Sequence, residues 1–155
     1  MKKTFLLIAL LGALACPAQD AKPDFSGKWT LDAGKSDFGP MPAPSSQVHV
    51  IEHKDPKLKV TTTTKSQQGD RTSEASYTTD GKENANPGFG GQEVKSTTKW
   101  DGKKLVTQRK VQAQGMDIEI KDTWELAEDS NGFNVTRDLK TPQGDFTQKM
   151  VYAKE

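Results

Sequence analysis

The chain has 155 residues, of which 32% are hydrophobic and 28% charged, with one cysteine and a formal net charge of +1. That length is typical of a single domain. The balance of 22 basic against 21 acidic residues excludes a strongly basic nucleic-acid binder, so we expect no nucleic-acid partner. One cysteine excludes an internal disulfide framework and a cysteine-rich metal cluster.

Residues 1–15 have the layout of a secretory signal peptide. Lys2 and Lys3 precede an apolar run from Phe5 to Leu11, and small residues follow. The apolar run is shorter than the ~20 residues needed to span a bilayer, so we expect export rather than a transmembrane anchor. The two lysines leave with this segment, which changes the formal net charge of the remaining chain from +1 to −1.

Two processing routes fit the residues around Cys16. The sequence Ala13-Leu14-Ala15-Cys16 resembles a bacterial lipobox, in which the cysteine is lipid-modified and becomes the new N-terminus. Alternatively, signal peptidase cuts before Cys16 or after Ala18 and leaves a soluble protein. An exposed free thiol is unfavourable in an oxidising compartment, which fits a lipid on Cys16. We expect a linker over residues 16–24, membrane contact only through that lipid, and a protein that is periplasmic, secreted or lipid-anchored in a bacterial envelope.

From Phe25 onward, short runs rich in Thr, Val and aromatic residues are broken by Gly, Pro, Asn and Asp at intervals of about ten residues. A chain this polar can build strands with one solvated face, because only alternate residues need be apolar. Nine strands are predicted: Phe25–Asp32, Gln47–Lys54, Leu58–Lys65, Arg71–Thr78, Gln92–Trp100, Lys103–Gln112, Asp117–Leu126, Phe133–Lys140 and Asp145–Ala153.

The turns between these runs place apolar residues on one common face. Turns at 55–56 and 68–69 pair Ile51 with Val60 and Val60 with Tyr77. Turns at 101–102, 114–115, 131–132 and 142–143 align a row of Thr98, Leu105, Trp124, Leu139 and Phe146. This pattern predicts an all-β, antiparallel up-and-down meander in one domain over 25–155. Because a meander has two edges unless it curls, we expect a closed barrel, with a two-sheet sandwich as the alternative.

The first predicted strand opens with a recognisable motif. Gly27-Lys28-Trp29 resembles the Gly-x-Trp opening of lipocalins and the wider calycin group, and the run from Trp29 to Phe38 is similar to uncharacterised exported bacterial proteins. The resemblance implies that Trp29 closes one end of the barrel beneath a basic residue from a late strand, here Arg137. Avidin-type proteins open similarly, but Leu31 stands where they carry a biotin-contacting asparagine, so biotin binding is not implied.

Two segments are predicted to be irregular. Residues 32–46 contain prolines at 40, 42 and 44, which make a stiff loop, and the lipocalin resemblance implies that this loop partly covers the open mouth. Residues 83–91 include Pro87-Gly88-Phe89-Gly90-Gly91. Loops of this length are either functional or mobile tips, and the sequence leaves both readings open.

Several polar residues face inward in the predicted barrel. Ser96, Thr107 and Asp122 share a row, and Arg109 lies diagonally opposite Asp122, close enough for a charge pair. Such a pair either grips a polar ligand group or serves a structural role. His49 and His53 also point inward, but residues four apart on a strand lie ~13 Å apart, so no shared metal ion is predicted. His49 alone is a candidate polar contact.

Small-molecule binding is the function favoured by these features. The sequence contains no Gly-x-Ser-x-Gly elbow and no nucleophile beside a base, so no catalytic residue and no cofactor are predicted. We expect a monomer that binds a small, partly polar molecule inside the barrel, through Trp29, His49, Tyr77, Trp100, Arg109, Asp122, Trp124 and Arg137. The alternatives are a filled barrel acting as an envelope or surface interaction module, and an enzyme. An interior below ~300 Å³ would remove the basis for ligand binding.

Overall fold

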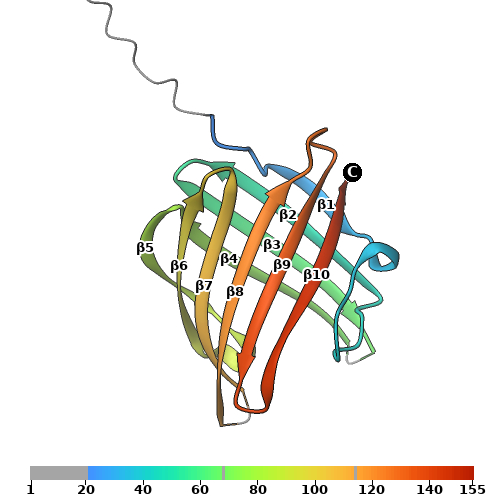
Figure 1. The fold of residues 1–155 in the computed structure, drawn as a ribbon, viewed down its shortest axis with the longest axis vertical. Coiled ribbons are helices and arrows are strands. Elements are labelled where there is room, and N and C mark those ends of the chain that lie inside the picture. Colours follow the sequence, from blue (N-terminus) through green and yellow to red (C-terminus); the bar gives the residue numbers. More distant parts are fainter. Residues whose placement is uncertain (1–20, 68, 114) are drawn as a thin grey trace, which may run out of the picture.

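The structure is a computed structural model that describes residues 21–67, 69–113 and 115–155. The predicted signal peptide and Cys16 lie outside the described residues. Ten antiparallel strands form one sheet (Figure 1). They are β1 (Gly27–Leu31), β2 (Ser46–Lys54), β3 (Lys57–Ser66), β4 (Gly69–Thr78), β5 (Asp80–Pro87), β6 (Glu93–Asp101), β7 (Lys104–Ala113), β8 (Met116–Leu126), β9 (Gly132–Thr141) and β10 (Gly144–Lys154).

The first strand pairs with the last, and the resulting continuous sheet curls into a nearly closed barrel. Its order is β4-β3-β2-β1-β10-β9-β8-β7-β6-β5, so every hydrogen-bonded neighbour except the β1–β10 pair is consecutive in the chain. The two ends of this order, β4 and β5, are themselves consecutive and lie beside each other (Figure 1). The predicted up-and-down barrel is confirmed, and the sandwich alternative is wrong. Among the described residues, no helix is long and apolar enough to cross a membrane.

The prediction of nine strands missed β5. The segment expected to be irregular over 83–91 is strand as far as Pro87, and a short 3-10 turn, η2 (Phe89–Gly91), follows it. Gly81, Asn84, Asn86 and Pro87 all have low β-propensity, which hid this strand in the sequence. Its pairing with β6 supplies what local propensity lacks.

The predicted faces are correct, although some registers shift along the strands. Leu105 lies opposite Trp124 and Ile51 opposite Val60, as expected. Trp124, however, lies opposite Val135 rather than Leu139. All such shifts are by an even number of residues, which keeps the same side chains inward. The observed inward row is Trp100, Leu105, Trp124, Val135 and Met150.

Aromatic side chains fill one end of the barrel. Phe25 has no exposed surface, and its ring centroid lies 5.8 Å from those of Trp124 and Phe133. Trp29 is equally buried, and its Nε1 donates to the Phe25 carbonyl at 2.8 Å. The basic side chain over Trp29 is Lys154, with Nζ 5.1 Å from the ring centroid. The assignment of Arg137 to that position is therefore wrong, because Arg137 bonds a carboxylate deeper inside the barrel.

The first half of the long loop after β1 is fixed along β10. It begins with a 3-10 turn, η1 (Ala33–Lys35), and Asp37 then exchanges two backbone hydrogen bonds with Lys149, each 2.7 Å long. Gln148 Nε2 donates to the Phe38 carbonyl, and Phe38 packs against the core. These contacts extend the sheet beyond the end of β1.

The backbone conformation and the surroundings of Gly27 explain why the Gly-x-Trp motif has glycine at this position. Its φ is +139°, and a Cβ there would lie 3.1 Å from Lys154 Cε, beside the Trp29 ring. Gly27→Ala should therefore lower the free energy of unfolding by about 1–3 kcal/mol, measured by urea denaturation. Gly34→Ala, at a glycine without positive φ, is the control and should change stability little. Equal losses in both variants would contradict the role given to Gly27.

Candidate functional site

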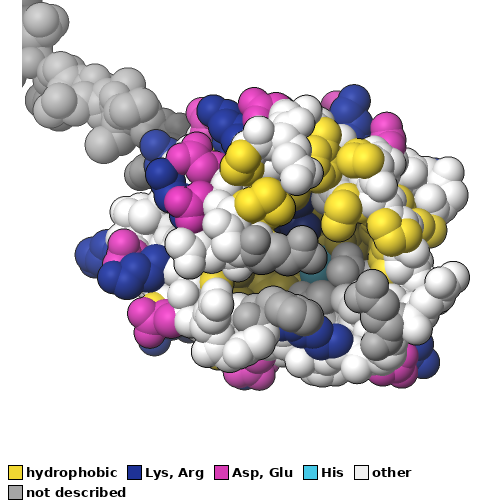
Figure 2. All heavy atoms as spheres, turned by 90° about the horizontal axis from the view of Figure 1, so that it is seen from below, with side chains coloured by type: hydrophobic (Ala, Val, Ile, Leu, Met, Phe, Trp, Pro, Cys, Tyr) yellow, Lys and Arg dark blue, Asp and Glu magenta, His cyan; other side chains and the backbone are white. Residues whose placement is uncertain are grey.

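The end of the barrel opposite the aromatic core opens into an interior cavity of about 720 Å³. Viewed from this end, the surface is hollowed, and hydrophobic side chains border one side of the hollow (Figure 2). Inward side chains of the strands form the cavity wall, and its apolar members include Val60, Val94, Val111, Ile120 and Met150. The volume exceeds the ~300 Å³ below which small-molecule binding would lose its basis.

A carboxylate held between two guanidinium groups lies in the wall of this cavity. Asp122 on β8 is 3% exposed and lies opposite Arg137 on β9. Arg137 donates from Nε to Oδ1 at 2.6 Å and from Nη2 to Oδ2 at 3.1 Å. Arg109 on β7 donates from Nη1 to Oδ2 at 2.7 Å. The predicted pair of Arg109 and Asp122 is thus part of a triad, which we call the Asp122 triad.

The Asp122 triad carries one net positive charge. Burial raises the pKa of Asp122, but Arg137 and Arg109 outweigh this effect and lower it to about 2, so the carboxylate is ionised at neutral pH. The side chains of Arg109 and Arg137 are 19% and 31% exposed, and both line the cavity. Both guanidinium groups therefore border the cavity, where a positive charge acts more strongly than in bulk water.

Uncharged polar groups surround the triad. His49 Nδ1 lies 2.8 Å from Thr62 Oγ1, and the ring centroid is 4.7 Å from that of Tyr152. Burial, with a smaller contribution from Arg137, lowers the pKa of His49 to about 4, so its imidazole is neutral at pH 7. The Tyr152 hydroxyl donates to Gln47 Oε1 at 2.5 Å. Burial also raises the pKa of Tyr77, which stays neutral in the same wall.

The structure brings most of the predicted ligand-contacting residues into this one cavity. Those lining it are His49, Tyr77, Arg109, Asp122, Trp124 and Arg137. Trp29 and Trp100 instead lie at the closed end, away from the cavity wall. Trp29 is in the core, and Trp100 donates from Nε1 to Asp55 Oδ1 at 2.8 Å. These two tryptophans support the floor and do not touch the space that a ligand could occupy.

Several cavity residues were not singled out from the sequence. Tyr152 on β10 and Gln47 on β2 form a hydrogen bond with each other. These two strands lie near each other only because β1 pairs with both of them. Asn86 and Pro87 belong to the strand that was not predicted. The alternation along β10 places Tyr152 inward with Met150, so inward parity was the one available signal for it.

The second inward histidine lies outside the cavity wall. His53 accepts a hydrogen bond at Nδ1 from the Phe25 amide at 3.2 Å, at the closed end of the barrel. Within residues 21–67, 69–113 and 115–155, no group of three or more His, Cys, Asp or Glu side chains is arranged to hold a metal ion. His49 and His53 therefore lie in different environments and do not form one site.

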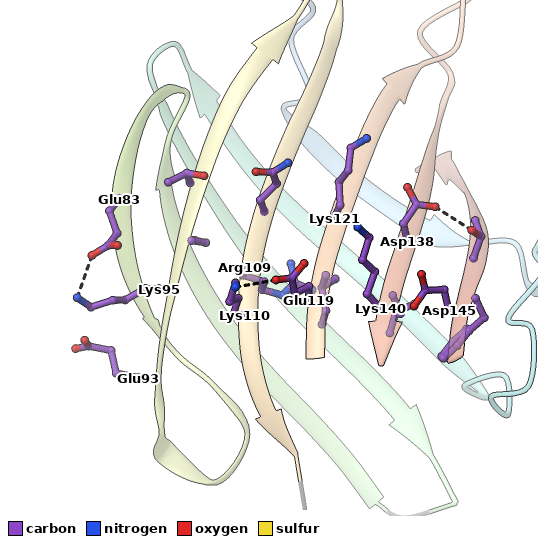
Figure 3. A pocket seen from close by; sticks show the side chains of 17 residues that line it. Glu83, Glu93, Lys95, Arg109, Lys110, Glu119, Lys121, Asp138, Lys140 and Asp145 are labelled. Carbon is purple, nitrogen blue, oxygen red and sulfur yellow. Dashed lines mark hydrogen bonds and ion pairs between the residues drawn. The ribbon is translucent and has the colours of Figure 1, made fainter. Parts of the chain in front are cut away.

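A wider groove of about 1080 Å³ lies over the outer face of β5–β10 (Figure 3). Ion pairs across neighbouring strands cover it, including Lys95–Glu83 at 3.0 Å and Lys110–Glu119 at 2.7 Å. These side chains are more than half exposed, so their pairing contributes little energy. The interior is the better candidate site, because it can enclose a ligand and already holds a buried, partly compensated charge.

The structure is thus a ten-stranded antiparallel up-and-down β-barrel with an interior cavity. No protein-family model matches the sequence, and no curated protein does. Among solved structures, the chain is similar to a protein described as the REP1-NXSQ fatty acid transporter, with 19% identity, a TM-score of 0.58 and coverage of 84% of this chain and 95% of that one.

Two further structures share the barrel. The fluorescent protein UnaG aligns with 20% identity, a TM-score of 0.62 and coverage of 84% of this chain and 97% of that one. The zebrafish ileal bile acid-binding protein, complexed with cholic acid, aligns with 17% identity, a TM-score of 0.61 and coverage of 84% and 98%. At these identities the likeness shows the fold alone, an antiparallel β-barrel that this chain shares with the three structures.

Because of the Asp122 triad, the free energy of unfolding should depend on pH in the acid range. The pKa of Asp122 falls from its ordinary 3.8 to about 2 on folding, so the triad stabilises the fold above about pH 4 and loses this contribution as the pH falls towards 2. Between pH 5 and pH 2, the wild type should lose about 2 kcal/mol more unfolding free energy than Asp122→Asn. Urea denaturation at each pH measures it. Asp138→Asn, on the outer face, should keep the wild-type dependence; equal slopes for wild type and Asp122→Asn would contradict the assignment.

Proposed function

We propose that this protein binds a small, largely apolar molecule carrying one anionic group inside its barrel. The observation that carries the proposal is the 720 Å³ cavity whose wall holds the Asp122 triad, with one positive charge in excess. An anion that leaves water for the cavity needs a compensating charge, and the guanidinium groups supply one. Arginine also presents N–H groups in a fork that matches a carboxylate.

The rest of the cavity suits the apolar part of such a molecule. Val60, Val111, Ile120 and Trp124 form aliphatic and aromatic surface around the charged triad. Known ligand pockets combine a mainly apolar wall with a few placed polar groups in this way. Two of the structural neighbours are described by fatty acid transport and by a bound cholic acid, and both of those molecules join an apolar body to a carboxylate.

We also propose that the protein is an exported, lipocalin-like barrel of a bacterial envelope. The support is the sequence of residues 1–15 and the lipobox-like residues before Cys16. Mass spectrometry of the protein recovered from membrane and soluble fractions tests this directly. An acylated N-terminal Cys16 supports the anchored form, an unmodified chain beginning at or after Cys16 supports the soluble form, and a retained Met1 contradicts export.

A titration with laurate and with dodecanol tests the ligand class. The two probes share an alkyl chain, but only laurate is anionic. Intrinsic tryptophan fluorescence, to which Trp124 in the cavity wall contributes, should report binding of laurate. Dodecanol should bind at least about tenfold more weakly, because a charge-assisted hydrogen bond to an arginine is lost. Arg109→Gln should remove most of this difference. Equal affinities for both probes in the wild type would contradict an anionic ligand.

A bulky side chain in the cavity tests where the ligand lies. Val111 lines the cavity, so the indole of Val111→Trp should occupy ligand space and weaken laurate binding at least about tenfold. Val50→Trp is the matched control, because Val50 is 44% exposed on the barrel surface. Isothermal calorimetry measures both affinities. Equal binding by the two variants would place any laurate site elsewhere, and no binding by the wild type would favour the ligand-free envelope module.

A further inference from the structure

One serine in the wall of the interior cavity has a hydroxyl group without a partner. Ser96 lies on β6, lines the cavity and is 5% exposed. Within the described part of the chain, its Oγ makes no hydrogen bond. A hydroxyl buried in this way has lost its bonds to water without replacing them, and native proteins keep few such groups. Its capacity to donate and to accept is therefore free for a molecule that enters the cavity.

The neighbouring polar side chains on the inward face are bonded to each other. Thr98, the next inward residue on β6, has its Oγ1 2.9 Å from Thr107 Oγ1 on β7. Asn84, which lies opposite Ser96 on β5, donates from Nδ2 to Thr78 Oγ1 at 3.0 Å. Ser96 thus differs from its neighbours, because their polar groups are used within the barrel wall.

Ser96 also lies beside the positive charge of the cavity. It is directly opposite Arg109 in the β6–β7 ladder, where the Cβ atoms of opposite residues are about 5 Å apart. The Arg109 side chain reaches away from β6, and its Nη1 donates to Asp122 Oδ2 on β8 at 2.7 Å. An arginine has five N–H donors, so Arg109 keeps others for a ligand. An anion bound there lies about one strand spacing, ~5 Å, from the Ser96 hydroxyl.

The wall next to these two residues becomes apolar towards the mouth of the cavity. Trp100 marks the closed end of β6, so Val94 lies nearer the open end than Ser96 does. Val94 lines the cavity, as does Val111, which is two residues from Arg109 on β7. A ligand with its polar groups at Ser96 and Arg109 therefore has its apolar chain directed towards the mouth.

We propose that Ser96 determines the specificity of the cavity for an amphipathic acid with a hydroxyl group close to its carboxylate. Arg109 binds the carboxylate, as in the proposed function on which this inference rests, and Ser96 bonds the hydroxyl. Rotation about χ1 directs Oγ to the ligand without a backbone movement. A hydroxyl on the third carbon suits the short distance between the two residues. A hydroxyl at the far end of the chain would lie in the apolar part of the cavity.

Calorimetric titration with laurate, 3-hydroxylaurate and 12-hydroxylaurate tests this specificity. The wild type should bind 3-hydroxylaurate about fivefold more tightly than laurate, because one hydrogen bond is gained, and 12-hydroxylaurate no more tightly than laurate. Ser96→Ala should abolish the preference for 3-hydroxylaurate and change the laurate affinity by less than about twofold. Thr97→Val is the matched control, because Thr97 is the next residue on β6 and borders the outer groove, and it should keep the preference.

The titrations separate this inference from the proposed function. Equal affinities of the wild type for laurate and 3-hydroxylaurate would overturn the role of Ser96, while laurate binding would still support an anionic ligand. A preference for 3-hydroxylaurate that persists in Ser96→Ala would overturn it as well. No binding of any of the three acids would overturn the proposed function and this inference together.

Urea denaturation without any ligand tests whether the Ser96 hydroxyl is free. Ser96→Ala should have the same midpoint as the wild type or a higher one, because no hydrogen bond is lost. Thr98→Val should have a lower midpoint, because the hydroxyl of Thr98 is bonded to that of Thr107. A lower midpoint for Ser96→Ala would show that its hydroxyl is already bonded in the free protein, and this result would overturn the proposal.

Discussion

The interior of this barrel depends on one buried carboxylate held by two guanidinium groups. Asp122 joins β7, β8 and β9 through Arg109 and Arg137, and its ionised form is stabilised in place. Three charged side chains cannot be packed against apolar neighbours without a large desolvation cost. They keep this half of the interior polar and open, and they give it a positive charge that suits an anion.

The apolar side chains of the chain are gathered at the other end. Phe25, Trp29 and Phe133 fill the closed end with rings in direct contact. This division explains how so polar a sequence supports both a core and a cavity. The aromatic end supplies the burial that stabilises the fold, and the open end retains the cavity and the charged side chains.

Strand alternation was the strongest signal in the sequence, and it predicted the inward face correctly. It could not predict the absolute register, because the turn lengths of β-hairpins allow shifts by two or four residues with the same parity. The triad was foreseen only in part for this reason. The Arg109–Asp122 pair follows from one hairpin, whereas Arg137 reaches Asp122 only in the shifted register of β8 and β9.

The sequence by itself determined which residues face inward and that the chain forms an all-β meander, because both depend on local alternation and turn residues. The tertiary structure decided where the barrel closes. The pairing of β1 with β10 brings Tyr152 to Gln47, and it leaves β4 and β5 as ends joined by Asn84 and Asn86. The first contact joins residues far apart in the chain, and the second involves a strand of low β-propensity. No local sequence pattern therefore specifies either contact. Closure likewise separated the tryptophans, since Trp29 and Trp100 became floor and Trp124 became cavity wall.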